Sequence, residues 1–325
     1  MSNFRGADGA LIGVAAVWGS SYLAAKVATD VAPVAVVVWG RYVVAAVAAF
    51  ALLAGRSAVA RRAGFVRRGT RGARVWPTRA EASVGWVLGV TQAAVLVLET
   101  VGVAHTSAAN AGVLISLAIM VTPLAEAMFG WARVPRTFYL AGVCCLIGVA
   151  LIVSAHGWGG LAAGDLLVLG AAVVRGIHVA LIGRYAAAAR PFQLTAIQLA
   201  VGAVLTLPWA LFATGGRLGA AIVGHGPALW LAVAYLALGC SLAAFLAQTW
   251  AVQQTSASRA SLLLGTEPVW ALAVAVVATG QGLTVMALAG AAMLIGGTYY
   301  GQAIEAKARA GVRMTTRPKS QGAPA

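Results

Sequence analysis

The chain contains one short pattern twice. Residues 103–108 read V-A-H-T-S-A, and residues 252–257, which lie 149 positions later, read V-Q-Q-T-S-A. Each copy leads into an apolar segment that contains a proline, Pro123 in the first and Pro268 in the second. The repeat predicts that the chain is built from two related halves.

The similarity between the halves extends upstream of these copies. The matched positions, some of them across a short gap, are Glu99-Thr100 with Gln248-Thr249, Gly85-Trp86 with Ala234-Tyr235, Val17-Trp18-Gly19 with Val174-Arg175-Gly176, and Pro33 with Pro191. Two related halves in a strongly apolar chain are typical of membrane transporters, where a substrate path forms between the repeats.

The composition indicates a lipid environment. Of the 325 residues 61% are hydrophobic and 10% are charged, whereas a soluble domain carries about 25% charged residues. A membrane-spanning helix needs about 20 mainly apolar residues, so we predict an all-α integral membrane protein with ten transmembrane helices. The expected spans are 9–30, 33–55, 82–104, 107–131, 137–155, 164–186, 191–214, 227–252, 257–280 and 283–303.

The basic residues predict the orientation of these spans. With a cytoplasmic N-terminus, nineteen of the 23 Lys and Arg fall on the cytoplasmic side and only Arg217 falls on the outer side; the other three lie within spans. The positive-inside rule therefore predicts that both termini are cytoplasmic. The net charge of +15 then reflects basic loops beside the membrane, and the Arg-rich loop 56–81 has only two aromatic residues, Phe65 and Trp76, so no nucleic-acid partner is expected.

An odd number of spans in each half predicts an inverted repeat. Residues 9–155 would form the first five-helix repeat, 164–303 the second, and 304–325 a basic cytoplasmic tail. The two repeats would be related by a pseudo-two-fold axis in the membrane plane, with a substrate site near the midplane.

Six short motifs follow this layout. They are W-G-S-S-Y at 18–22, R-Y at 41–42, T-S-A-A at 106–109, G-D-L-L at 164–167, T-S-A-S-R-A-S-L-L-L at 255–264 and E-P at 267–268. With these motifs in this order and at this spacing, the chain resembles the EamA family of the drug/metabolite transporter superfamily. The resemblance implies a multi-pass carrier of the cell (inner) membrane that moves small metabolites by alternating access, often as an exporter. The chain departs from the family at 130–133 (G-W-A-R), at 280–283 (G-Q-G-L) and at Arg175, where members commonly place Trp.

Charged residues inside the expected spans are the first candidates for a site. A charge at the bilayer centre costs at least about 2.5–3.5 kcal/mol, so it normally faces the protein interior or a cavity. Arg175 and Glu267 are both expected near mid-depth and could pair. Arg41 and Glu99 share a second depth zone and could also pair. Each pair is either a fixed tie between helices or part of a binding or coupling site.

Arg175 is the strongest candidate for a substrate ligand, because neither the repeat nor the family resemblance explains it. Its guanidinium would bind a carboxylate or phosphate of an anionic or zwitterionic metabolite, with Glu267 as counter-ion when the site is empty. His178 follows one turn later on the same helical face, and Trp18 and Trp270 lie mid-span where they could wall a pocket. Packing roles for these last three residues remain the alternative.

The sequence carries no sign of enzymatic chemistry. It contains no P-loop for ATP and no H-E-x-x-H, its four histidines lack metal-ligand spacing, and no cofactor is expected. Its three cysteines, Cys144, Cys145 and Cys240, lie in apolar segments and are expected to pack. The alternative to a transporter is a non-transporting membrane scaffold or assembly subunit.

Overall fold

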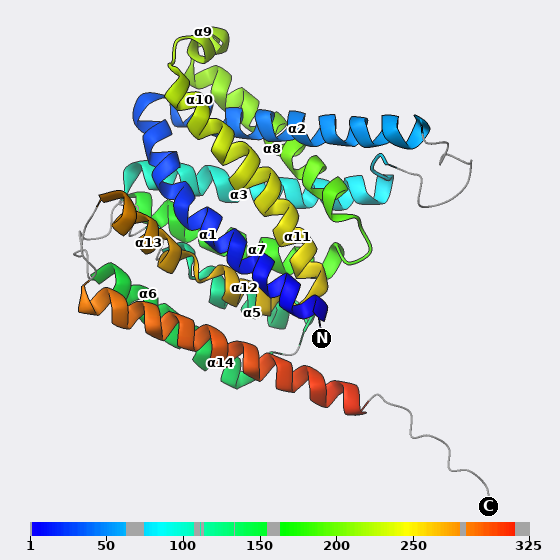
Figure 1. Cartoon of the computed structure of the whole chain (residues 1–325), viewed down its shortest axis with the longest axis vertical. Coiled ribbons are helices and arrows are strands. Elements are labelled where there is room, and N and C mark those ends of the chain that lie inside the picture. Colours follow the sequence, from blue (N-terminus) through cyan, green and yellow to red (C-terminus); the bar gives the residue numbers. More distant parts are fainter. Residues whose placement is uncertain are drawn as a thin grey trace, which may run out of the picture.

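The computed structural model describes residues 2–62, 75–106, 111, 114–132, 134–154, 163–279 and 284–315. Within these ranges the ordered elements are all helical, and they pack into one bundle (Figure 1). The all-α prediction is therefore confirmed. The motif at 106–109 lies outside the described residues except for Thr106, as do the segment 280–283 and residues 316–325.

The helices of the first half are α1 (Ser2–Val31), α2 (Val34–Arg62), α3 (Arg79–His105), α5 (Ala118–Met128) and α6 (Arg136–Ser154). Those of the second half are α7 (Ala163–Tyr185), α8 (Pro191–Ala213), α9 (Leu218–Val223), α10 (Pro227–Ala234), η2 (Tyr235–Ala243), α11 (Ala244–Gln254), α12 (Ala257–Leu264), α13 (Glu267–Thr279) and α14 (Val285–Thr315). Six helical stretches in the described residues are long and apolar enough to cross a membrane.

Several helix ends follow local sequence signals. Thr78 and Glu81 form a reciprocal capping box at the start of α3, which satisfies backbone N–H groups that have no partner within the helix. Proline stands at the first position of α8, where its missing N–H costs nothing. After α8 the chain turns through Gly215 and Gly216, both at positive φ, a conformation that glycine adopts without strain.

Two helical segments are interrupted at equivalent positions. Residues 116–117 form a turn before α5, and residues 265–266 form a turn between α12 and α13, so the interruptions are 149 positions apart, like the sequence repeat. Each interruption begins a new half-helix in the interior of the bundle, at Ala118 and at Glu267. Interrupted helices of this kind form the binding sites of many transporters.

Two glycines allow close contact between the halves. A β-carbon at Gly19 in α1 would lie 2.7 Å from the backbone nitrogen of Ala271 in α13. A β-carbon at Gly176 in α7 would lie 2.5 Å from Cβ of Val121 in α5. Small residues at such contacts let helix backbones approach closely. In both cases the first helix of one half packs against the interrupted helix of the other.

One stretch of the bundle departs from α-helical geometry. The nine residues of η2 form a π-helix between α10 and α11, whereas the corresponding helix α3 of the first half is α-helical throughout. The π-helix packs against α1 and α2. Such segments are rare and occur often at functional sites.

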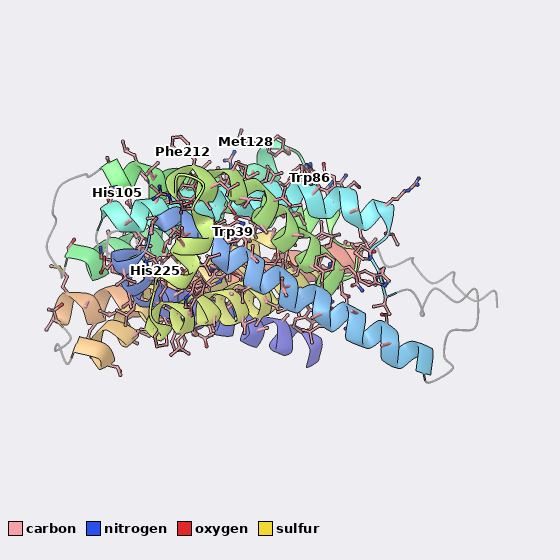
Figure 2. The ribbon with its side chains drawn as sticks, turned by 90° about the horizontal axis from the view of Figure 1, so that it is seen from above. Trp39, Trp86, His105, Met128, Phe212 and His225 are labelled. Atoms are coloured by element: carbon pink, nitrogen blue, oxygen red, sulfur yellow. The ribbon has the colours of Figure 1, made fainter. Side chains whose placement is uncertain are left out.

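The outer surface carries large apolar side chains. Phe212 is 87% exposed, Met128 80% and Trp86 51%, and all three project from the outer edge of the bundle in Figure 2. These exposed apolar side chains favour contact with lipid, because exposing them to water would cost free energy. At the C-terminal end the expected tail is helical at its start, since α14 continues to Thr315.

Candidate functional site

The centre of the bundle holds a buried cluster of charges around Arg175. Arg175 lies midway along α7, and its Nη1 donates to Glu267 Oε2 at 2.8 Å. Its Nη2 donates to Glu99 Oε2 at 3.1 Å. The side chains of Arg175, Glu99 and Glu267 are only 10%, 11% and 2% exposed. The expected contact between Arg175 and Glu267 therefore forms, and Glu99 joins it.

The positions of these side chains follow from the helix packing. Glu267 is the first residue of α13, so the interruption of the helix places its carboxylate in the interior. Glu99 reaches the same point because α3 packs along α7. A guanidinium between two carboxylates has both terminal nitrogens engaged, which compensates for the loss of hydration on burial.

Two aromatic residues of α1 complete the cluster. The Arg175 guanidinium lies 4.6 Å from the centroid of the Trp18 ring, a cation–π contact. The Trp18 indole N–H donates to the Cys240 carbonyl at 2.9 Å, which fixes the ring. Tyr22 donates its hydroxyl proton to Glu267 Oε1 at 2.6 Å. Tyr22 was missed in the sequence, although it lies four residues after Trp18 and therefore on the same helical face.

A small cavity adjoins this cluster. It has room for about one water molecule, because the centre of a water-sized sphere can occupy a volume of only about 10 Å³ inside it. Both interrupted segments contribute to its wall, which consists of Ile115, Ser116, Ala118, Ile119, Thr122, Arg175, Val179, Ser261, Leu264, Gly265 and Glu267. The three hydroxyl residues in this wall were not singled out in the sequence. An organic molecule enters this site only if the surrounding helices move apart.

His178 lies one turn beyond Arg175 but outside the cavity wall. Its Nδ1 is 2.8 Å from the Thr91 hydroxyl oxygen, and that hydroxyl already lies within donating distance of the backbone carbonyls of Val87 and Leu88. Nδ1 therefore carries the proton and donates to Thr91. The other ring nitrogen, Nε2, is buried and has no hydrogen-bond partner among the described residues.

The pairing expected for Arg41 and Glu99 is wrong. Glu99 forms its ion pair with Arg175, and Arg41 Nε instead donates to the Ser241 hydroxyl at 2.6 Å. Residues at the same depth can share a membrane layer and still point to different neighbours, because depth does not fix the rotation of a helix about its axis.

Trp270 does not wall the cavity. Trp270 is 37% exposed and is absent from the residues that line the cavity, and its β-carbon lies close to α1 at the position of Gly19. Glu126 is 8% exposed and accepts a hydrogen bond from Ser258. Lys26 lies at the surface, where it pairs with Asp30 at 3.3 Å.

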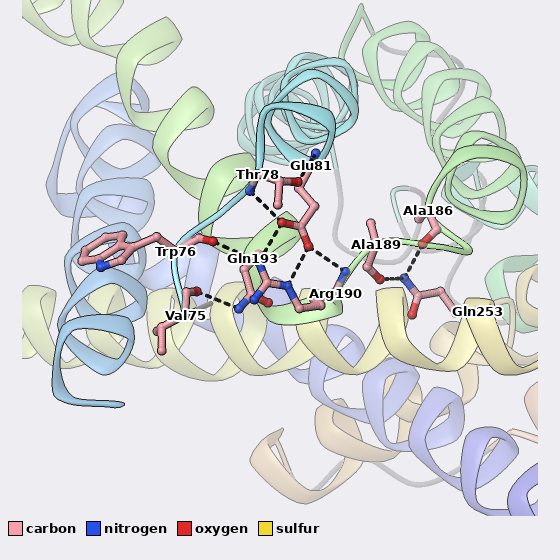
Figure 3. A network of polar contacts seen from close by, with 9 residues as sticks. All are labelled: Val75, Trp76, Thr78, Glu81, Ala186, Ala189, Arg190, Gln193 and Gln253. Atoms are coloured by element: carbon pink, nitrogen blue, oxygen red, sulfur yellow. Dashed lines mark hydrogen bonds and ion pairs between the residues drawn. The ribbon is translucent and has the colours of Figure 1, made fainter. Parts of the chain in front are cut away.

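A second polar network lies where α3 and α8 begin (Figure 3). Arg190 donates from Nε and Nη2 to the two carboxylate oxygens of Glu81, both at 2.8 Å. The hydrogen bonds with Glu81 raise the pKa of Arg190 above its ordinary value. Nearby, Gln193 donates to the Val75 carbonyl and Gln253 donates to the carbonyls of Ala186 and Ala189. This network joins helix ends and encloses no cavity that the structure records.

The described residues contain no group of three or more His, Cys, Asp or Glu side chains placed to hold a metal ion. A multi-helix bundle with an apolar exterior, interrupted helices and a buried charge cluster has features that are found in membrane transporters.

Residues 162–300 match the model of the EamA-like transporter family, so the second half of the chain is similar to this family. The match is consistent with the drug/metabolite transporter superfamily and confirms the resemblance drawn from the sequence motifs.

A solved structure, titled only as the crystal structure of a protein, has the same fold with a TM-score of 0.66. The alignment covers 92% of this chain and 97% of the other at 19% identity, so it supports the fold alone. No curated protein matches the chain.

Proposed function

We propose that this chain is a secondary transporter that moves a small organic metabolite across the inner membrane by alternating access, in the export direction that the family resemblance favours. The observation that carries the proposal is the buried Arg175 cluster, which opens on a cavity between the two interrupted helices. A charge cluster inside a membrane bundle is costly, and it marks a site of substrate or ion binding.

The proposed architecture is ten spans in two inverted repeats, 9–155 and 164–303. Its support is the spacing of 149 between the two helix interruptions and the reciprocal contacts at Gly19 and Gly176. Exchanging the two halves maps the contact between α1 and α13 onto the contact between α7 and α5. In this arrangement the Arg175 cluster lies near the midplane, where such folds bind substrate.

In the proposed cycle Arg175 and Glu267 form the substrate site beneath the Trp18 ring. Glu99 and Glu267 hold the guanidinium while the site is empty, and a substrate group replaces one of these contacts. His178, on the next turn of α7, lines the path that opens when the helices separate. Trp270 is left out of the site, because its indole lies away from the cavity.

Metabolite profiling tests this proposal. Cells that overexpress the chain are compared with an empty-vector control, and the solutes enriched in the medium are identified. Arg175→Ala should abolish the enrichment when export is compared at equal amounts of protein in the membrane. Arg175→Lys should restore little because an ammonium lacks the planar fork, and Arg217→Gln is the matched surface control. Unchanged export by both Arg175 variants would place the site elsewhere. A protein that moves no solute and co-purifies stoichiometrically with a partner would instead be a scaffold.

The proposed orientation has its own test. Reporter fusions after residue 68 and at the C-terminus should report cytoplasm, and a fusion near residue 160 should report the outer side. A C-terminus on the outer side would mean an odd number of spans and would contradict the inverted repeat.

A further inference from the structure

Arg41 and Arg175 are two equally buried arginines with opposite charge environments. Arg41 is 7% exposed and Arg175 is 8% exposed. Arg175 has two carboxylates within ion-pair distance, whereas Arg41 has none among the residues that the structure describes. Only a neutral hydroxyl, that of Ser241, accepts a hydrogen bond from Arg41. Arg41 is therefore a buried cation without a fixed counter-ion in the described bundle.

Burying a charge without a counter-ion destabilises the folded protein. Burying a guanidinium removes its hydration, and a hydroxyl dipole replaces only a small part of the lost free energy. A buried cation without a carboxylate partner is a ready binding partner for an anion, since an incoming acidic group recovers the missing interaction.

The matched position in the second half of the chain carries no charge. Arg41 lies eight residues after Pro33, and the residue eight positions after the matched Pro191 is Leu199. Leu199 is fully buried in α8 and packs as an ordinary core residue. The same position in the other half is therefore filled by an apolar side chain.

The surroundings of Arg41 suit an organic acid. The π-helix η2 passes beside it and supplies the Ser241 hydroxyl, while at the start of η2 the Tyr235 hydroxyl is hydrogen-bonded to Ser20 of α1. The Trp230 ring lies against Gly40, the residue before Arg41, and offers an apolar wall. The ionisable groups that face this region are Tyr42 of α2, Tyr235 and Cys240 of η2, and Glu99 of α3.

We propose that Arg41 binds the acidic group of an organic anion, a carboxylate, phosphate or sulfonate, and that the substrate of this chain belongs to this class. The inference rests on the proposed transport function, because it places a second substrate contact on the same path. The two terminal nitrogens of Arg41, which carry no hydrogen bond to a described residue, bind the acid as a fork, with Nε held by Ser241.

Binding of benzoate and phenyl phosphate to the purified full-length protein tests this, with phenyltrimethylammonium as the cationic control. Titration is followed by calorimetry. The wild type should bind at least one of the two anions and not the cation. Arg41→Leu should weaken anion binding at least about tenfold, and Arg41→Lys should recover part of it.

Arg41→Leu is chosen because Leu199 fills the equivalent position in the other half. It should melt at the same temperature as the wild type or higher, because it removes an unpaired buried charge. Ser241→Ala breaks the only described hydrogen bond of Arg41 and should weaken anion binding by less than about threefold.

Three results would overturn the proposal. They are no binding of either anion by the wild type, equal anion binding by Arg41→Leu, and a loss of thermal stability in Arg41→Leu that Ser241→Ala reproduces, which would make Arg41 a structural tie. The two proposals fail separately. Export that requires Arg175 but proceeds normally in Arg41→Leu refutes only the role of Arg41, and anion binding through Arg41 without export of any solute refutes only the transport function.

Discussion

The Arg175 cluster and the Arg190 network use the same chemistry in two different environments. In both, an arginine donates to a carboxylate at 2.8 Å. The side chains of Arg175 and Glu267 are 10% and 2% exposed, whereas those of Arg190 and Glu81 are 37% and 8% exposed, so the two pairs differ mainly in their arginines. The first ion pair lies inside the bundle beside a cavity, and the second joins two helix ends.

Burial decides what each arginine contributes. Water reaches Arg190, so its charge stays hydrated when Glu81 is removed, and its ion pair is worth little. Arg175 has no such alternative, and loss of one partner leaves an unpaired charge in the interior. An apolar core would be at least as stable and would cost less free energy to insert in a membrane, which supports the proposal that the central cluster has a functional role.

The largest effect is expected for Arg175→Leu. It leaves Glu99 and Glu267 buried together without a cation, and it should lower the free energy of unfolding by about 3–5 kcal/mol. Unfolding in mixed micelles with increasing dodecyl sulfate measures the change. The triple variant with Glu99→Gln and Glu267→Gln should recover most of the stability but no transport. A single variant as stable as the wild type would show that the cluster is hydrated, like the network at Arg190.

The next effect concerns packing beside the central cluster. A β-carbon at Gly19 would meet the α13 backbone at 2.7 Å, whereas at Gly13, also in α1, there is no atom within 4 Å. Gly19→Ala should destabilise the protein by about 1–3 kcal/mol, because α1 and α13 must separate. Gly13→Ala should change stability little or increase it slightly, since alanine favours the helix. Equal melting temperatures of the two variants would mean that the close contact at the centre is absent.

Trp18→Phe should have a smaller effect on stability, about 1–2 kcal/mol. Phenylalanine keeps an aromatic face near Arg175 but cannot donate to the Cys240 carbonyl, which is left without that partner. Thermal melting measures the loss, and Trp76→Phe, at an exposed position, is the control. If Trp18→Phe melts like this control, the indole hydrogen bond does not fix the ring.

The smallest effect is expected for Arg190→Gln. The loss should be about 0.5–1 kcal/mol, because Arg190 is 37% exposed and Glu81 keeps the backbone N–H donors of Thr78 and of residue 190. Raising the salt from about 0.1 M to about 1 M should shrink this difference, because the screening length falls from about 10 Å to about 3 Å. The effect of Arg175→Leu should stay nearly constant over the same range. A salt-independent Arg190→Gln effect would remove the distinction between the two regions.

The predictions from sequence succeeded where the position of a residue along its helix, and hence its depth in the membrane, was enough. Hydropathy predicted a helical chain with ten spans, and six helices in the described residues are long and apolar enough to cross a membrane. The contact between Arg175 and Glu267, which was expected from their similar depth, is present. The expected depth of Glu99 in the membrane predicted the wrong partner, Arg41 in place of Arg175. The expected depth of Trp270 did not predict which way its side chain points. These depend on helix rotation, which neighbouring helices set through packing. The π-helix η2 also escaped prediction, because its sequence reads as an ordinary apolar helix.

The sequence by itself indicated the membrane environment and the helical class of this protein, because backbone groups in lipid must bond within helices and the apolar composition reflects that constraint. It also carried the resemblance to the EamA-like transporter family, whose model residues 162–300 match. It also supplied the repeat of 149 residues, which the two helix interruptions follow. Only the tertiary structure decided that Arg175 lies between two carboxylates while Arg41 has a single hydroxyl. Side chains more than 75 positions apart meet there, and which of them meet depends on how α3, α7 and α13 pack together.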